Sequence, residues 1–196
     1  MRVLTIGHSN RSADEFVRLL RAHHATAVAD VRARPFSRRN PHFSRKNLES
    51  LLTSAGIAYE HFPSLGGHRM PRPDSVNGGW RNEAFRGYAD HMQTTDFMQG
   101  LGALLEFAEK YLVAVMCAES QWRDCHRQLL ADALFVRAVD VRHIMSADDL
   151  MAHELTPFAR VTAQETDRVT AGATARETAG VTKGVTNTVV DYPALF

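Results

Sequence analysis

At 196 residues with 44% hydrophobic side chains, the chain is long enough to bury one full core but too short for two large domains. Its 23 Lys and Arg residues nearly balance 22 Asp and Glu residues, so the net charge of +1 argues neither for nor against a nucleic-acid partner. No apolar run approaches the ~20 residues of a membrane span, so we expect no membrane partner. With two cysteines and no signal-peptide pattern at its start, the chain is expected in the reducing cytoplasm.

The first third of the chain predicts strands and helices in alternation. Short apolar or β-branched runs predict strands, and leucine or phenylalanine at helical spacing predicts amphipathic helices. The predicted strands are residues 3–8, 25–32 and 57–63, and the predicted helices are residues 13–23 and 45–56. Ser12 and Ser44 precede the helices as capping residues, and Gly56 ends the second helix.

The next part of the chain begins with a long loop. Residues 64–85 are rich in Gly, Pro and Asn, and an irregular connection of this length predicts a binding loop. Helices are then predicted over 84–92, 95–110, 124–137 and 146–154, with strands over 111–117 and 141–145. This alternation predicts a single-domain α/β fold, with a mostly parallel sheet of about five strands and helices on both faces.

A segment of different composition follows the predicted α/β domain, which covers residues 1–160. Residues 161–190 are mostly Val, Thr, Ala and Gly, and Thr recurs at every fourth position from Thr162 to Thr186. Such a segment has few large side chains to bury, so we expect a flexible insert. The closing residues 191–196, DYPALF, regain aromatic side chains that could dock on the domain.

Polar side chains of reactive types follow four predicted strands in succession. They are His8 and Ser9, then Asp30 and Arg32, then Arg69 behind a pair of glycines, and finally Cys117 and Glu119. Each of them alone is more typical of a structural residue. Because a parallel sheet places its ligand site beyond the carboxyl ends of its strands, their shared position predicts a functional site there.

The two cysteines suggest two different chemistries. Cys117 and Arg123 have C-x5-R spacing before a predicted helix, where backbone N–H groups and the arginine could hold an anion and lower a thiol pKa. Cysteine phosphatases and rhodanese-type sulfurtransferases use such loops. However, bulky Gln121 and Trp122 stand where small residues usually allow the tight turn.

A metal site is the competing interpretation. Cys117, Glu119, Cys125 and His126 are all suitable ligands for zinc or iron, but the paired C-x2-C spacing of zinc sites is absent. On a helix, adjacent Cys125 and His126 would also point about 100° apart. We therefore expect no metal and no other cofactor, and we expect Cys125 to be a buried residue on a helix face.

Several segments taken together carry a family resemblance: TIGHS (5–9), ADVRARPFSRRNPHFS (29–44), GIAYEHFPSLGGHR (56–69), FRGYADHM (85–92), VMCAES (115–120), CHRQLLADAL (125–134) and VRHIM (141–145). They closely resemble the bacterial family called domain of unknown function 488 (DUF488), over residues 3–160 and the last few. The Thr-rich segment departs from the family pattern. The resemblance implies a compact cytoplasmic α/β protein with a functional site, and it leaves the reaction open. The recurrent polar residues of the family stand here as His8, Ser9, Asp30, Arg32, Arg38, Arg69, Cys117, Glu119, Cys125, His126 and Arg127.

The first function that these residues suggest is an enzyme. Its substrate would be a small molecule bearing a phosphate, sulfate or nucleotide group. Cys117 would act as the nucleophile or Glu119 as the acid and base, and His8 and Asp30 would complete the catalytic group. The expected substrate-binding residues are Ser9, Arg32, Arg38, Arg69, Arg123, His126 and Arg127.

Two other functions remain open. Residues 31–86 hold ten basic side chains against four acidic ones, and Phe36, Phe43 or Trp80 could stack on a base, so a nucleic-acid binding or base-processing protein is the first alternative. In the second alternative, the protein is a non-catalytic interaction module and the polar residues form a satisfied structural network. The expected partner is therefore a small anionic substrate or a nucleic acid.

Overall fold

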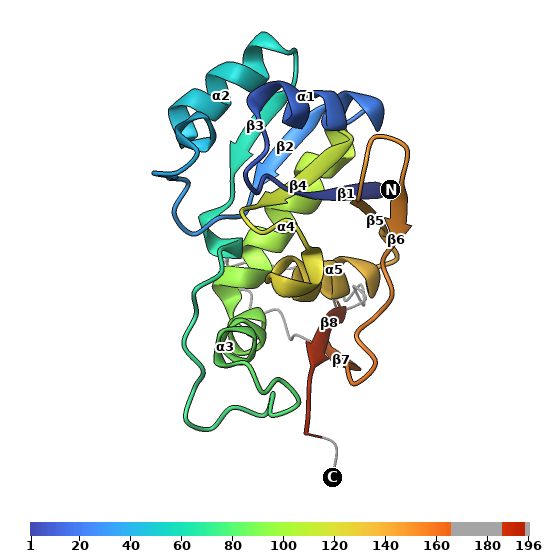
Figure 1. Cartoon of the computed structure of the whole chain (residues 1–196). Coiled ribbons are helices and arrows are strands. Elements are labelled where there is room, and N and C mark those ends of the chain that lie inside the picture. Colours follow the sequence, from blue (N-terminus) through green and yellow to red (C-terminus); the bar gives the residue numbers. More distant parts are fainter. Residues whose placement is uncertain (166–185, 195–196) are drawn as a thin grey trace, which may run out of the picture.

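A six-stranded sheet forms the centre of the protein, in the order β3-β2-β4-β1-β5-β6 (Figure 1). Its strands are β1 (Arg2–Gly7), β2 (Ala27–Asp30), β3 (Ala58–His61), β4 (Val113–Cys117), β5 (Asp140–Ile144) and β6 (Leu150–Ala152). The computed structural model describes residues 1–165 and 186–194. The first five strands are parallel, and β6 adds an antiparallel edge beside β5. The predicted single-domain α/β fold is confirmed, and the sheet has one edge strand that was not predicted.

Helices cover both faces of this sheet (Figure 1). On one face lie α1 (Ala13–Ala22) and α2 (Arg45–Ser54), and on the other lie α3 (Glu83–Met92), α4 (Thr95–Lys110) and α5 (Arg127–Phe135). Ser12 caps α1 as predicted, because its side chain accepts a hydrogen bond from the N–H of Glu15. Gly56 follows α2 with a φ of +73°, a conformation that glycine adopts without strain.

Alternate side chains of the same strand pack on opposite faces. In β4, Ala114 and Met116 join the core under α1 and α2, whereas Val113, Val115 and Cys117 join the core under α3, α4 and α5. All residues of β4 are buried, which explains its continuously apolar sequence. Cys117, the last residue of the strand, therefore points to the face that carries α5.

Two predicted helices differ from the structure. Residues 146–154 form a turn and the edge strand β6, because the backbone N–H of Met145 bonds to the carbonyl of Asp149 and reverses the chain against β5. The predicted helix 124–137 begins only at Arg127. A short 3-10 helix, η3 (Trp122–Asp124), occupies the preceding residues, and Cys125 between the two helices has an extended backbone.

Both ends of the Thr-rich segment are strands. β7 (Arg160–Glu165) and β8 (Thr186–Asp191) pair antiparallel, with Val161 opposite Val190. This ribbon lies beside α3 and α5, and the adjacent Tyr192 is fully buried. The rest of the segment expected to be flexible, residues 166–185, lies outside the described residues.

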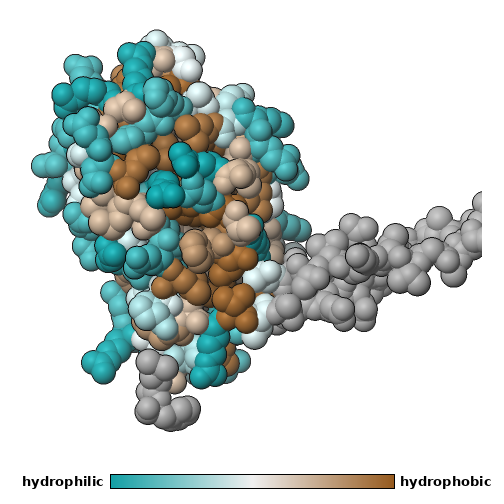
Figure 2. Space-filling model, turned by 90° about the vertical axis from the view of Figure 1, so that its right-hand side faces the viewer, coloured by the Kyte–Doolittle hydropathy of each residue, from teal (hydrophilic) through white to brown (hydrophobic). Residues whose placement is uncertain are grey.

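The surface mixes polar and apolar side chains. Figure 2 shows the face that lies to the right in Figure 1, where hydrophobic residues stand between hydrophilic ones. Met151 of the edge strand β6 is among the exposed apolar side chains. Within the described part of the chain, no helix is both long and apolar enough to cross a lipid bilayer.

Candidate active site

A cavity of about 690 Å³ opens at the carboxyl ends of β1, β2 and β4. These ends are neighbours because β4 pairs with β1 on one side and with β2 on the other. This is the edge at which a parallel sheet is expected to bind its ligand. Five of the side chains predicted for the site line this cavity: His8, Arg32, Cys117, Glu119 and His126.

Cys117 reaches the cavity from the end of β4. Its Sγ lies 2.8 Å from Oε2 of Glu119, to which the thiol donates a hydrogen bond. The loop that carries Glu119 lies directly against the end of β1, and a Cβ atom on Gly7 would lie only 1.8 Å from the carbonyl oxygen of Glu119. Glycine at position 7 is therefore required for the loop to place Glu119 beside Cys117.

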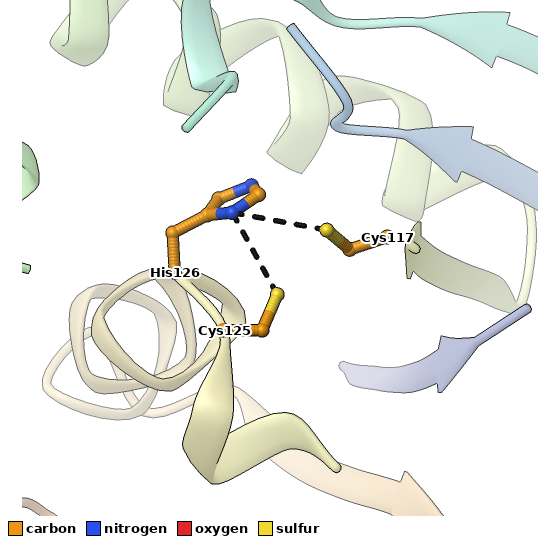
Figure 3. Close-up of side chains that lie close together, drawn as sticks. All are labelled: Cys117, Cys125 and His126. Carbon is orange, nitrogen blue, oxygen red and sulfur yellow. Dashed lines mark hydrogen bonds between the residues drawn. The ribbon is translucent and has the colours of Figure 1, made fainter. Parts of the chain in front are cut away.

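Cys125 and His126 reach the same point from the start of α5 (Figure 3). The Sγ atoms of Cys125 and Cys117 lie 3.6 Å and 3.8 Å from Nδ1 of His126. The expectation that Cys125 lies on a helix face is wrong, because its backbone is extended (φ −140°, ψ 153°) and precedes the helix. That conformation removes the 100° separation assumed for two adjacent helical residues, so both side chains face the cavity.

A single hydrogen bond sets the orientation of the His126 ring. Its Nε2 lies 3.0 Å from the carbonyl oxygen of Val31. A carbonyl only accepts, so Nε2 carries the hydrogen and, in the neutral ring, Nδ1 presents its lone pair to the two sulfur atoms. The ring also packs closely against Gly67, where an added Cβ would lie 2.8 Å from Nδ1.

Arg127 supports the site from behind. Its side chain is 1% exposed, and its backbone N–H and Nε each donate to Sγ of Cys125 over 3.4 Å. The guanidinium also donates to the carbonyls of Glu119 and Ser120. Arg127 therefore fixes the loop after β4 relative to Cys125 and does not reach into the cavity.

The two thiols differ in acidity. The hydrogen bond with Cys125, followed by burial, raises the pKa of Cys117 well above its ordinary value. Burial also raises the pKa of Cys125, but the contact with Cys117, the neighbouring His126 and the charge of Arg127 together lower that pKa well below its ordinary value. Within the pair, Cys125 is thus the more acidic thiol, and Cys117, whose S–H donates to Glu119, is the less acidic one.

His8 and Arg32 form the opposite wall with a buried ion pair behind them. The Arg32 guanidinium binds Asp30 through two hydrogen bonds of 2.8 and 2.6 Å, and its NH1 also donates to His8 Nε2 and the Phe43 carbonyl. Burial lowers the pKa of His8 to about 4, with a smaller contribution from the charge of Arg32. Asp30 accepts a further hydrogen bond from Tyr59 and is fully buried, so it lies behind the cavity wall.

The other predicted substrate-binding residues lie outside the cavity lining: Ser9, Arg38, Arg69 and Arg123. The Arg69 guanidinium donates to the carbonyl of Gly66 and to neighbouring backbone. Arg123 is exposed and lies over the ring of Trp122, 4.1 Å from its centre. The predicted C-x5-R cradle is therefore not formed, because the arginine does not face Cys117.

Sequence reasoning did not place a second group of lining side chains in the strand-end site: Arg34, Phe36, His68, Phe85, Asp124 and Cys125. It named Phe36 only as a possible base-stacking residue, and Cys125 only as a possible metal ligand and a recurrent family residue. Arg34 and Phe36 follow β2 directly, and His68 follows the glycine pair after β3. The rule that ligand sites lie beyond strand ends could have found these three. No spacing in the sequence indicates that Phe85 or Asp124 reaches the cavity.

A second polar cluster is closed and structural. A chain of hydrogen bonds joins Thr5, His143, His153 and Asp132, and the Asp132 carboxylate also accepts from Thr156 and Tyr192. All six residues are buried, and none of them lines the cavity. The two histidines thus connect β1, β5 and α5 to the segment after β8.

Comparison with known proteins gives one match. The model of the family described as "Domain of unknown function DUF488" matches residues 12–134. This span runs from α1 into α5 and includes Cys117, Glu119, Cys125 and His126, but not His8. No curated protein and no solved structure matches the chain.

Proposed function

The chain belongs to the DUF488 family, and we propose that it is an enzyme that acts on a small anionic substrate in this cavity. The observation that carries the proposal is the convergence of Cys117, Cys125 and His126 on one point of an open cavity, with the Glu119 carboxylate beside them. Titratable and nucleophilic groups gathered in a cavity at the sheet edge are characteristic of active sites.

The contrast with the closed cluster supports this interpretation. Around Asp132 and His153, the polar atoms are paired and buried in the core, as in a structural network. At the cavity, by contrast, Glu119 is exposed, and the two buried cysteines line the open volume. A carboxylate that is accessible and placed next to a reactive group is suited to proton transfer.

Charge around the cavity suggests how a substrate would lie. Arg34 is exposed on one side, and its guanidinium has no hydrogen-bond partner among residues 1–165 and 186–194. The Arg32 charge, by contrast, is neutralised by Asp30. Glu119 and Asp124 line the same cavity. We therefore place the anionic group of the substrate at Arg34 and the reacting bond near Glu119.

Turnover of a substrate panel tests the proposal. The panel would contain phosphate monoesters and diesters, sulfate esters and nucleosides. Glu119→Gln should lower kcat by about 10²- to 10⁴-fold, as expected for loss of an acid or base. Arg34→Gln should chiefly raise KM, and Arg123→Gln, outside the cavity, should change neither. Turnover that is equal in wild type and Glu119→Gln would contradict the proposal.

A nucleic-acid substrate is the second candidate. Phe36 lines the cavity yet is 67% exposed, and Arg34, Arg38 and Arg39, all exposed, lie next to it in the chain. Aromatic and basic side chains in this combination bind single strands by stacking and by charge. The candidate requires oligonucleotide binding that weakens with added salt and is lost in Phe36→Ala. Binding that does not depend on salt would remove it.

A further inference from the structure

We infer that Cys117, Cys125 and His126 bind a Zn²⁺ ion at the floor of the cavity, with one coordination position open. The inference rests on the proposed function and names the cofactor of the same site. The ligand atoms of the three residues lie within 4.8 Å of one another. Figure 3 shows both sulfur atoms turned towards the same ring nitrogen of His126.

The distances fit a tetrahedral zinc site. With Zn–S of about 2.3 Å and Zn–N of about 2.1 Å, tetrahedral angles place sulfur and nitrogen about 3.6 Å apart. The observed separations from His126 Nδ1 are 3.6 Å for Cys125 and 3.8 Å for Cys117. The three side chains therefore need little movement to surround an ion.

The groups around the ligands are those that a metal site requires. The bond from His126 Nε2 to the Val31 carbonyl leaves Nδ1 as the coordinating nitrogen, and such second-shell bonds hold metal-binding histidines in place. Two N–H groups of Arg127 donate to the Cys125 sulfur. Two sulfur ligands and one imidazole favour zinc, whereas Mg²⁺ and Ca²⁺ prefer oxygen ligands.

Three protein ligands and an open position are typical of catalytic rather than structural zinc. Here the open side is the cavity, and Glu119 stands next to Cys117. A water molecule at the open position would give one proton to Glu119, and its oxygen would form the new bond to the electrophilic atom of the substrate. The bond to the leaving group would break, and that group would take the proton from Glu119. The net reaction is hydrolysis.

Metal titration tests the inference. The reduced protein, freed of metal with a chelator, would be titrated with Zn²⁺ and, separately, with Co²⁺ as a spectroscopic probe. We expect one equivalent of either ion, with thiolate-to-cobalt charge-transfer and tetrahedral d–d bands. Cys125→Ser and His126→Gln should each weaken binding about 10-fold or more. The matched control is His68→Gln, which alters the same cavity but should bind as wild type.

Two results would overturn the zinc site. One is wild-type protein that binds no stoichiometric Zn²⁺ and gives no thiolate-to-cobalt bands, a result that needs no variant to fold. The other is His126→Gln protein that binds cobalt with the wild-type affinity and spectrum. Failure of the proposed function would look different. Stoichiometric zinc without turnover of any panel substrate would contradict the enzyme and keep the metal site. Turnover that survives complete metal removal would keep the enzyme and contradict zinc as its cofactor.

Discussion

Nδ1 of His126 lies 3.6 Å from Sγ of Cys125, so the side chains of two adjacent residues point towards each other. The extended backbone of Cys125, between η3 and α5, turns the sulfur towards the imidazole that follows it. Cys117 at the end of β4 then completes a cluster at which two parts of the fold meet.

Gly67 should be needed for the His126 position. A Cβ at residue 67 would lie 2.8 Å from Nδ1 of His126, so Gly67→Ala must displace the ring from the two sulfurs. We expect cobalt affinity to fall about 10-fold or more, as measured by optical titration. Gly102→Ala is the matched control, because its Cβ would meet nothing within 4 Å and should leave metal binding unchanged. Equal affinity in both variants would refute the prediction.

In metal-free protein, Cys125 should be alkylated faster than Cys117. Cys125 has a lowered pKa and Cys117 a raised one, so Cys125 has the larger thiolate fraction, and the thiolate is the form that reacts with iodoacetamide. Peptide mass spectrometry after brief labelling identifies the modified residue. Arg127→Met removes a donor and a positive charge from Cys125 and should slow its labelling at neutral pH, whereas Arg123→Met should not. Faster labelling of Cys117 would show that the charge is distributed the other way.

Breaking the pair of Asp30 and Arg32 should destabilise the protein. Both side chains are buried, and Asp30→Asn leaves the guanidinium without its counter-charge. We expect a loss of about 3–5 kcal/mol in the free energy of unfolding, measured with urea. Asp140→Asn, which removes a partly exposed carboxylate paired with both Arg2 and Arg142, should cost about 1 kcal/mol or less. A near-neutral or stabilising effect of Asp30→Asn would instead indicate an active-site carboxylate.

Stability should fall in acid partly because of His143. Burial, and next the neighbouring His153, lower the pKa of His143 to about 3. In the unfolded chain, His143 takes up a proton at its ordinary pKa of about 6.5. Between this pH and the lower pKa of the folded state, the unfolded chain therefore binds more protons than the folded protein. The contribution of neutral His143 to the free energy of unfolding is therefore complete above about pH 6.5. It is lost as the pH falls towards 3, by up to about 1.4 kcal/mol per pH unit.

The check is urea unfolding of wild type and His143→Gln at a series of pH values within this window. The variant should show a shallower loss of stability as pH falls. The slope that remains includes His8, whose pKa is about 4. Identical slopes in the two proteins would mean that His143 takes up its proton in the folded state as readily as in the unfolded chain.

Much of the fold could be predicted because its signals are local. The apolar run of β4 and the Ser12 cap of α1 each depend on a few consecutive residues, and the structure has both elements at the expected places. Residues 146–154 were misassigned because Ser146 and the acidic residues after it suit a helix start as well as a tight turn. Pairing with β5, a contact beyond this segment, selected the strand.

The sequence by itself determined the α/β class, the edge of the sheet at which the cavity opens and several of the residues that line it, among them His8, Cys117 and Glu119. These follow from strand-end placement, since successive parallel strands all end at one edge. Only the tertiary structure decided the partners of Cys125 and the place of Arg123. A turn of the backbone before α5, set by the buried Arg127, directs Cys125 into the cavity, while stacking on Trp122 keeps Arg123 outside it. Side-chain direction at a helix start depends on packing around it, and spacing in the sequence does not record that packing.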